Sequence, residues 1–206
     1  MNTVLKPEDQ IFAERYSWIF KINSDYADSD SVLYMTEIAT PLGPMLAGAT
    51  LQGLCLLEFA NRIRLEKEIA DLRNLLKARI IPGRNQYSEQ AETELGEYFQ
   101  GLRKTFSVSL HTPGNDFAQA VWQSLLQIPY GQTCTYKEQA ERMNNPKAIR
   151  AIASTNGRNR LAIIIPCHRV IGSNGTMTGY AAGTDKKKWL LMFERSNSIS
   201  KENLLF

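Results

Sequence analysis

Residues 161–170 read Leu-Ala-Ile-Ile-Ile-Pro-Cys-His-Arg-Val, an apolar run followed by a proline, a cysteine and a histidine. The run from Leu161 to Ile165 is short and rich in β-branched residues, which predicts a buried strand that ends at Pro166. A thiol at the end of a rigid strand, with an imidazole next to it in sequence, is a candidate nucleophile because only the thiolate attacks at a useful rate. The stretch therefore predicts that Cys167 carries the chemistry of this protein.

The cysteine and histidine content limits what else this site can be. The three cysteines, Cys55, Cys134 and Cys167, form no CxxC pair, and His111 and His168 are the only histidines. No zinc ligand set fits these spacings, so we expect no metal and no other cofactor. Cysteines outside disulfides are most often small buried hydrophobes, and we interpret Cys55 and Cys134 in this way.

Length and charge set bounds on the organisation of the chain. The 206 residues are enough for one large or two small domains, and 43% of them are hydrophobic, which suffices for a packed core. Residues 1–112 hold 12 Lys and Arg against 15 Asp and Glu, or −3, whereas residues 113–206 hold 12 against 6, or +6. The basic half favours a polyanion as partner, although solvated surface charge explains the same numbers equally well.

No segment of the sequence is typical of secretion or of a membrane anchor. The start, Met-Asn-Thr-Val-Leu-Lys-Pro-Glu, lacks the basic and then apolar layout of a secretory signal. No apolar stretch approaches the ~20 residues that a membrane span requires. We therefore expect a cytoplasmic protein in a reducing compartment, with no membrane partner.

The first 112 residues are expected to hold an extension and a small α/β domain. Residues 1–30 show no clear period apart from one short helical stretch at 12–20, and we interpret them as an N-terminal extension. Residues 31–112 predict a small antiparallel sheet with helices. The expected strands lie at 34–37, in the two halves of 45–59 and at 106–110, and the expected helices lie at 62–79 and at 88–101, the second capped by Ser88.

Residues 113–206 form the second expected domain, because the charge shift coincides with the loop-forming sequence at 111–115. Four apolar residues spaced four, four and three apart predict a buried helical face near its start. These residues are Phe117, Val121, Leu125 and Ile128, and we assign Trp122 and Trp189 to the core as well. Further helices are expected over 136–143, capped by Thr135, over 147–155 after the corner Asn144-Asn145-Pro146, and from about Thr184 onward.

A helix, a short turn and a second helix in a basic domain have the layout of a helix-turn-helix, whose second helix usually enters a DNA groove. Many helical hairpins bind no nucleic acid, so the pattern favours DNA binding without establishing it. The expected fold class is mixed α/β (α+β). An N-terminal small antiparallel sheet with helices is followed by a mainly helical C-terminal domain, which holds the helix-turn-helix and a short sheet that carries the cysteine loop.

A set of motifs spread over residues 117–194 is shared with one known family. The motifs are Phe117, Val121-Trp122, Ile128-Pro129-Tyr130-Gly131, Thr135-Tyr136, Pro146-Lys147-Ala148-Ile149-Arg150-Ala151, Asn159, Pro166-Cys167-His168-Arg169-Val170, Gly179-Tyr180, Lys188-Trp189-Leu190-Leu191 and Glu194. With them the chain resembles the O6-alkylguanine-DNA alkyltransferases, also called methylated-DNA–protein-cysteine methyltransferases. The resemblance is strong over residues 113–195, holds only in outline over 33–110 and does not extend to 1–30.

The resemblance implies a single-turnover DNA repair enzyme that is inactivated by its own reaction. Cys167 would take the alkyl group from O6-alkylguanine in DNA, with O4-alkylthymine left open as a second substrate. By resemblance, His168 acts through a water as the base that deprotonates Cys167, Glu194 hydrogen-bonds His168, and Asn159 holds the active-site turn. Such help is needed because an ordinary thiol, with a pKa of about 8.5, is mostly protonated at neutral pH.

The resemblance also implies base flipping, since guanine O6 lies inside a stacked duplex where a thiol held in a protein cannot reach it. Arg150, on the second helix of the helix-turn-helix, matches the arginine that fills the gap left in the duplex. Tyr136 matches the tyrosine that promotes rotation and contacts the base. The family places this helix in the minor groove, and the small residues Ala148 and Ala151 would permit that close approach.

A pocket for the rotated base is implied in the same way. It would be formed by Tyr136, Val170, Tyr180, Ala181 and Lys187, with the backbone of Val170 and Ala181 holding the guanine edges. Relatives often have a glycine where Ala182 stands, so the added methyl group leaves the tolerance of bulky adducts open. The implied partner is double-stranded DNA that contains O6-alkylguanine, and the protein is expected to act as a monomer.

Two other functions compete with alkyl transfer. A binding-only relative would flip damaged bases without reacting, but such proteins lack the reactive cysteine that Cys167 supplies here. A cysteine hydrolase using Cys167 and His168 would turn over repeatedly, but it would give the basic helix-turn-helix no role. Alkyl transfer explains both features.

Overall fold

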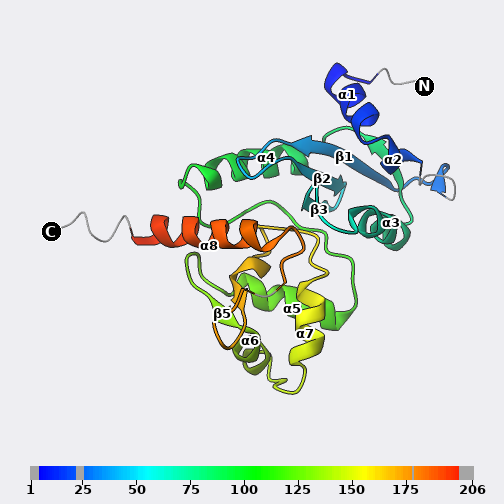
Figure 1. The fold of residues 1–206 in the computed structure, drawn as a ribbon. Coiled ribbons are helices and arrows are strands. Elements are labelled where there is room, and N and C mark those ends of the chain that lie inside the picture. The colour runs from blue at the N-terminus through cyan, green and yellow to red at the C-terminus, as the bar shows by residue number, and fades with distance from the viewer. Residues whose placement is uncertain (1–4, 22–25, 178, 200–206) are drawn as a thin grey trace. The chain divides into compact units, whose positions relative to one another are not determined.

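The computed structural model describes residues 5–21, 26–177 and 179–199 (Figure 1). Its internal contacts divide the chain into two compact units, the first containing residues 1–99 and 107–113 and the second containing residues 100–106 and 114–206. The mixed α/β class predicted from the sequence is confirmed. The predicted domain boundary at 112 lies next to this division and stays a prediction. Among the described residues, no helix is both long enough and apolar enough to cross a membrane.

The first unit is built on a four-stranded sheet in the order β3-β2-β1-β4. Strands β1 (Val32–Ile38), β2 (Met45–Thr50) and β3 (Gly53–Phe59) form the predicted antiparallel part. The turn between β2 and β3 requires Gly53, which has a φ of +153° and whose missing Cβ would lie 2.7 Å from the Ser109 carbonyl oxygen. The short strand β4 (Arg79–Pro82) pairs parallel to β1 and was not predicted from the sequence.

Helices cover both faces of this sheet, so every residue of β2 and β3 is buried. Helix α3 (Leu65–Leu76) packs on one face, while α4 (Gln86–Phe99) contacts β2 and β3. Asn85 rather than the predicted Ser88 caps α4, because the Asn85 Oδ1 accepts the backbone N–H groups of Tyr87 and Ser88. Residues 106–110 form no strand, and Leu110 makes only an isolated bridge to Leu54.

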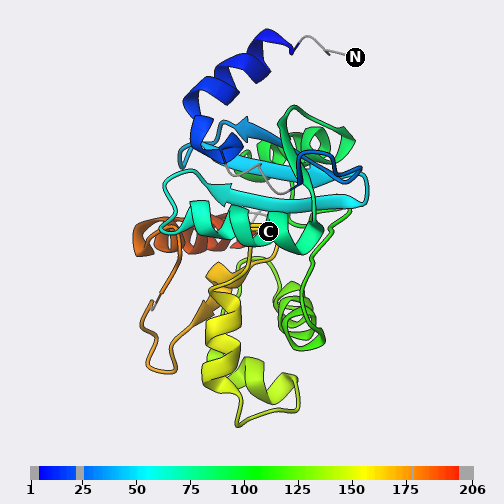
Figure 2. The same cartoon turned by 90° about the vertical axis from the view of Figure 1, so that its right-hand side faces the viewer.

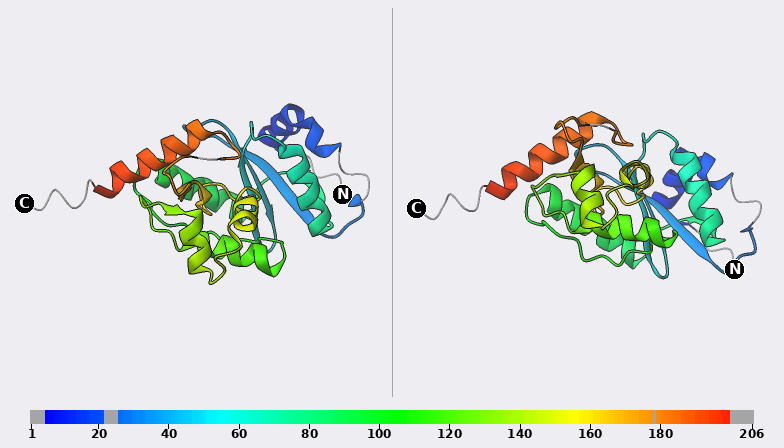
Figure 3. Two further views of the ribbon diagram at one scale, coloured as in Figure 1. Left: turned by 60° about the horizontal axis from the view of Figure 1, so that its bottom comes forward. Right: turned by 90° about the horizontal axis from the view of Figure 1, so that it is seen from below.

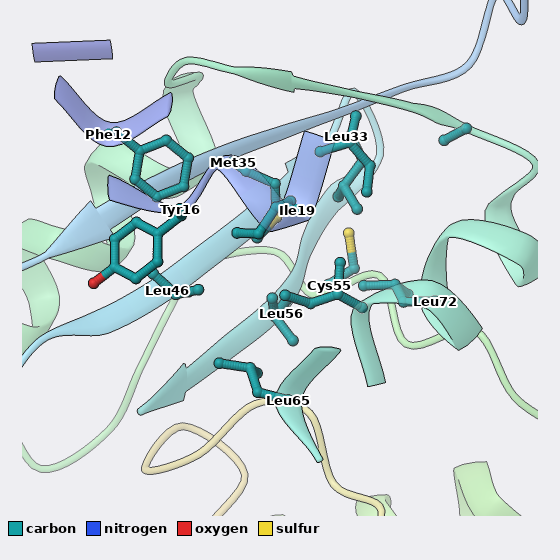
Figure 4. Packing of buried hydrophobic residues seen from close by; sticks show 13 residues of the cluster. Phe12, Tyr16, Ile19, Leu33, Met35, Leu46, Cys55, Leu56, Leu65 and Leu72 are labelled. Carbon is teal, nitrogen blue, oxygen red and sulfur yellow. The ribbon is translucent and has the colours of Figure 1, made fainter. Parts of the chain in front are cut away.

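The N-terminal residues belong to the core of the first unit rather than to a separate extension. Helices α1 (Pro7–Arg15) and α2 (Ser17–Phe20) bring Phe12, Tyr16 and Ile19 against buried side chains of the sheet and of α3 (Figure 4). The Phe12 ring lies 5.1 Å from the Tyr16 ring. The prediction of an extension over residues 1–30 did not include this packing.

Four main helices and a two-stranded parallel sheet make up the described part of the second unit (Figure 2). Helix α5 (Asp116–Leu126) is capped by Asn115, whose Oδ1 accepts the N–H of Ala118 at 2.9 Å. Strands β5 (Cys134–Thr135) and β6 (Val170–Ile171) pair in parallel, and α8 (Thr184–Ile199) ends the unit. Leu190 is buried in α8, whereas Trp189 is 38% exposed, so its assignment to the core was wrong.

The predicted helix-turn-helix is present as α6 (Tyr136–Arg142) and α7 (Ile149–Asn156). Thr135 caps α6 as predicted, in a capping box with Glu138. Asn144, with a φ of +54°, turns the chain between the two helices. Helices α5, α6 and α7 contact one another and form one group (Figure 3).

Candidate active site

Cys167 lies at the start of a short 3-10 helix, Cys167–Arg169, directly before β6. The predicted strand over 161–165 is wrong: these residues are buried as expected, but they form consecutive turns. The N–H of Ile165 donates to the Leu161 carbonyl at 2.9 Å, and Ile163 takes a left-handed φ of +71°. Such a φ is unfavourable for a β-branched residue, so the packing around the turn must hold it in place.

Asn159 holds this turn together from its inside. Its side-chain Nδ2 donates to the Ile165 carbonyl at 2.8 Å and to the Cys167 Sγ at 3.3 Å. Its Oδ1 accepts the N–H of Leu161 at 3.0 Å. Asn159 is buried and Cys167 is partly exposed, so the amide fixes a sulfur that solvent can reach. A donor on the sulfur favours its ionised form.

His168 and Glu194 form a hydrogen-bonded pair in the interior of the second unit. The His168 Nε2 lies 2.8 Å from the Glu194 Oε1, and both side chains are fully buried. The structure thus brings together the predicted site residues Cys167, His168 and Asn159. Glu194 of α8 contacts His168.

The Glu194 carboxylate is ionised despite its burial. Burial alone would raise the pKa of Glu194, but its hydrogen bonds and charge interactions with His168 and Arg169 outweigh that effect and lower the pKa to about 2. Burial lowers the pKa of His168, although Glu194 opposes this shift. The imidazole is thus neutral at pH 7, with Nε2–H donating to Glu194 and Nδ1 left as an acceptor. No described residue donates a hydrogen bond to Nδ1.

Arg169 is a site residue to which the sequence analysis assigned no role. Its Nε and Nη2 donate to the two Glu194 oxygens at 2.9 and 3.0 Å, and its Nη1 donates to the Ile128 carbonyl at 2.6 Å. The backbone N–H of Gly131 gives Glu194 a further donor at 3.1 Å. Arg169 could have been identified from the sequence, because it lies two residues after Cys167 and directly after a histidine that needs an ionised partner. The bidentate pair fixes the carboxylate that orients His168.

Two of the predicted pocket residues, Lys187 and Val170, contact each other directly after the cysteine loop. Lys187 is fully buried, and its Nζ donates to the backbone carbonyl of Val170 at 2.6 Å. Burial lowers the pKa of Lys187, and a charge interaction with Cys167 opposes that shift. Tyr180, Ala181 and Ala182 are half-buried in the loop that leads into α8.

The predicted DNA-contacting residues lie on the helix-turn-helix. Arg150 and Ala151 are exposed in the first turn of α7, and Ala148 precedes that helix. Tyr136 is half-buried at the first position of α6. The structure thus presents an exposed basic side chain next to Ala151, on a helix in which Ile152 is buried.

Comparisons with known proteins find relatives in sequence. Residues 116–196 match the model of the 6-O-methylguanine DNA methyltransferase, DNA binding domain. A methylated-DNA–protein-cysteine methyltransferase of Methanosarcina barkeri is 40% identical over 166 residues, which cover 80% of this chain and 99% of that protein. The constitutive methylated-DNA–protein-cysteine methyltransferase of Bacillus subtilis is 50% identical over 107 residues, 52% of this chain and 65% of that protein.

Solved structures give the same result. The O6-methylguanine methyltransferase of Mycobacterium tuberculosis matches with a TM-score of 0.69 and 36% identity, covering 80% of this chain and 94% of that one. A structure of that organism's OGT in complex with DNA matches with a TM-score of 0.68 at 36% identity, covering 81% of this chain and 94% of that one. With these matches in sequence and in fold, the chain belongs to the methylated-DNA–protein-cysteine methyltransferase family.

Proposed function

We propose that this protein repairs DNA by moving the alkyl group of O6-alkylguanine onto the Sγ of its own Cys167. The observation that carries the proposal is the hydrogen bond from the Asn159 amide to the Cys167 Sγ at 3.3 Å, next to His168, whose buried ring pairs with Glu194 of α8. A partly exposed thiol with a hydrogen-bond donor and a neighbouring base is arranged for nucleophilic attack. The family's name gives methylated DNA as the donor, a methyl group as the group transferred, and a protein cysteine as the acceptor.

The reaction is a single displacement at the alkyl carbon. The sulfur of Cys167 forms a bond to that carbon while the bond from the carbon to guanine O6 breaks. The thiol proton leaves the sulfur, and the guanine regains one proton, so the products are a thioether on Cys167 and unmodified guanine. Because a thioether is not reversed by this chemistry, each protein molecule reacts once.

The surrounding residues have distinct roles in this proposal. Neutral His168 accepts the thiol proton through a water at Nδ1, the ring nitrogen that does not face Glu194. Glu194 holds the ring in that tautomer and stabilises the imidazolium that forms, and Asn159 stabilises the thiolate by its N–H donor. The lowered pKa of His168 keeps the base unprotonated at neutral pH.

The helix-turn-helix binds double-stranded DNA and turns the damaged nucleotide out of the stack. In this proposal Arg150 fills the gap in the duplex, Tyr136 promotes the rotation, and Ala148 and Ala151 let α7 approach closely in the minor groove. The exposed position of Arg150 in the first turn of α7 supports its role. The pocket for the flipped base is formed by Tyr136, the backbone of Val170 and Ala181, the side chain of Tyr180, and Lys187 behind Val170.

The protein is proposed to act as a monomer in the cytoplasm, where a reducing environment keeps the acceptor thiol available. O6-alkylguanine is the proposed lesion, and O4-alkylthymine is the second one to test. The half-buried Ala182 near the pocket is the residue to vary when the range of adduct sizes is measured.

The test is stoichiometric exposure of the whole protein to a duplex with one O6-methylguanine, followed by intact-mass and peptide mapping. We expect one added methyl group per protein, located on Cys167, and none in the Cys167→Ala variant. Cys134→Ala is the matched control, because Cys134 is 1% exposed and should leave transfer intact. Repair by Cys167→Ala, or turnover of several equivalents per protein, would contradict the proposal, and the second result would favour a cysteine hydrolase.

A further inference from the structure

A buried amide pair joins the two helices of the helix-turn-helix. Gln139 of α6 is 1% exposed and Asn156 of α7 is 5% exposed. The Asn156 Nδ2 donates to the Gln139 Oε1 at 2.7 Å, and the Gln139 Nε2 donates back to the Asn156 Oδ1 at 3.3 Å. The same Nε2 donates to the Ser124 Oγ of α5 at 2.9 Å. Hydrogen bonds of Gln139 therefore join three helices, α5, α6 and α7.

Asn156 lies in the last turn of α7, which accepts a further hydrogen bond from α5. The indole Nε1 of Trp122 on α5 donates to the Thr155 carbonyl at 3.3 Å. At the opposite end of α7, the position before Ile149 is Ala148, whose side chain makes no capping hydrogen bond. The described hydrogen bonds from side chains of α5 and α6 to α7 thus lie at its last turn, whereas Arg150 lies in its first turn.

Apolar packing permits small sliding and tilting, whereas a reciprocal amide pair has a narrow range of distance and angle. Arg150 lies six residues before Asn156 in α7, which corresponds to about 9 Å along a helix that rises 1.5 Å per residue. A tilt of roughly 10° at the last turn would move Arg150 by about 1.6 Å, and functional groups tolerate misplacements of only about 0.5 Å.

We propose that Gln139 and Asn156 are positioning residues that aim Arg150 of α7 at the DNA. The inference rests on the proposed function, since it gives Arg150 its role in the flipped-base complex. The described hydrogen bonds of Gln139 go to Val121 and Ser124 of α5 and to Asn156 of α7, so its effect on α7 passes through Asn156. Its removal should slow the reaction with duplex DNA and spare the reaction with the free modified base.

The experiment compares second-order rates of methyl transfer to Cys167 from a methylated duplex and from free O6-methylguanine. In Gln139→Leu, which leaves the Asn156 amide buried without this partner, we expect the duplex rate to fall about tenfold and the free-base rate to fall less than twofold. Gln123→Leu is the matched control, because it makes the same change at an exposed position of α5 and should alter neither rate.

The double variant Gln139→Leu/Asn156→Leu separates positioning from stability. Replacing both partners with apolar groups of similar shape restores much of the lost stability, but it does not restore the directional restraint. We expect its melting temperature to approach that of the wild type while its duplex rate stays about tenfold low. The exchanged pair Gln139→Asn/Asn156→Gln keeps the amides and should recover part of the duplex rate.

Two results would overturn the inference. One is recovery of the wild-type duplex rate by the double leucine variant, which would reduce the amide pair to a stability effect. The other is an equal loss on duplex and free base in Gln139→Leu, which would place the defect at the cysteine. Failure of the wild-type protein to methylate Cys167 with either substrate would instead refute the proposed function, so the two failures are distinguishable.

Discussion

Replacing Glu194 with glutamine tests the electrostatics of the candidate site directly. The wild-type carboxylate is fully buried and accepts hydrogen bonds from His168, Arg169 and Gly131. Glutamine keeps one acceptor oxygen, but it removes the negative charge and turns an N–H₂ group toward donors. The Arg169 guanidinium, with a side chain only 7% exposed, would then lack its counter-charge in the interior.

The loss of folding stability in Glu194→Gln follows from the shifted pKa of Glu194. Glu194 has a pKa of about 2 in the folded protein, against an ordinary value of 4.5. The difference corresponds to about 3 kcal/mol of stability at pH 7, because each pKa unit is worth about 1.4 kcal/mol. That figure agrees with the roughly 3–5 kcal/mol lost when one partner of a buried ion pair is removed.

The lowered pKa of Glu194 also fixes how the stability difference between wild type and Glu194→Gln changes with pH. A lowered carboxyl pKa contributes its full stabilisation above the unfolded value of 4.5, and the contribution fades as the pH falls toward 2. The difference between wild type and Glu194→Gln should therefore be about 3 kcal/mol at pH 7 and shrink to about 1 kcal/mol at pH 3, where protonated Glu194 resembles glutamine.

Urea unfolding at the two pH values measures this difference. A Trp18→Phe background removes the tryptophan of the first unit, so that fluorescence reports on Trp122 and Trp189 of the second. Glu141→Gln is the matched control, since the Glu141 side chain is 51% exposed and such surface pairs contribute less than about 1 kcal/mol. A loss below about 1 kcal/mol at pH 7, or an equal loss at pH 7 and pH 3, would refute the reasoning.

Three further predictions follow from the same structure. Arg150→Ala should slow methyl transfer from duplex DNA at least tenfold more than transfer from the free base, and equal losses in the two rate assays would remove Arg150 from base flipping. Because burial lowers the pKa of His168 below 6.5, the transfer rate measured across pH should show the acid limb due to this base only below pH 6.5, and a limb above that value would contradict a neutral buried base. Phe12→Ala should destabilise the first unit by about 3 kcal/mol in urea unfolding, as for other buried phenylalanines, whereas a loss under about 1 kcal/mol would show that α1 is not part of the core.

The second unit could be predicted well from the sequence where local signals were strong. Thr135 followed three residues later by Glu138 marks a capping box, and the corner at Asn144 marks a turn, so α6 and α7 were located within a few residues. The His168–Glu194 pair followed from the family resemblance rather than from spacing. No local pattern relates two residues that are 26 positions apart.

The predictions that failed depend on tertiary packing. An apolar run such as 161–165 has no period, so burial was correct while the strand was wrong, because Asn159 satisfies the backbone groups of a turn there. Strand β4 has only four residues and ends in Pro82, so its pairing with β1 leaves little trace in the sequence. Helical spacing does relate Phe12, Tyr16 and Ile19. Their many polar neighbours in the sequence gave no sign that these side chains pack against the sheet.

The three cysteines differ in their exposure to solvent, so reagents that modify thiols should react with one sulfur atom only. Cys55 and Cys134 are each 1% exposed, and burial raises the pKa of Cys134, so both resist electrophiles and peroxides. Cys167 alone is within reach of solvent. Under the proposed function, oxidants and thiol-labelling reagents compete with damaged DNA for the same atom, and the fraction of protein that still accepts a thiol label at Cys167 measures the repair capacity that remains.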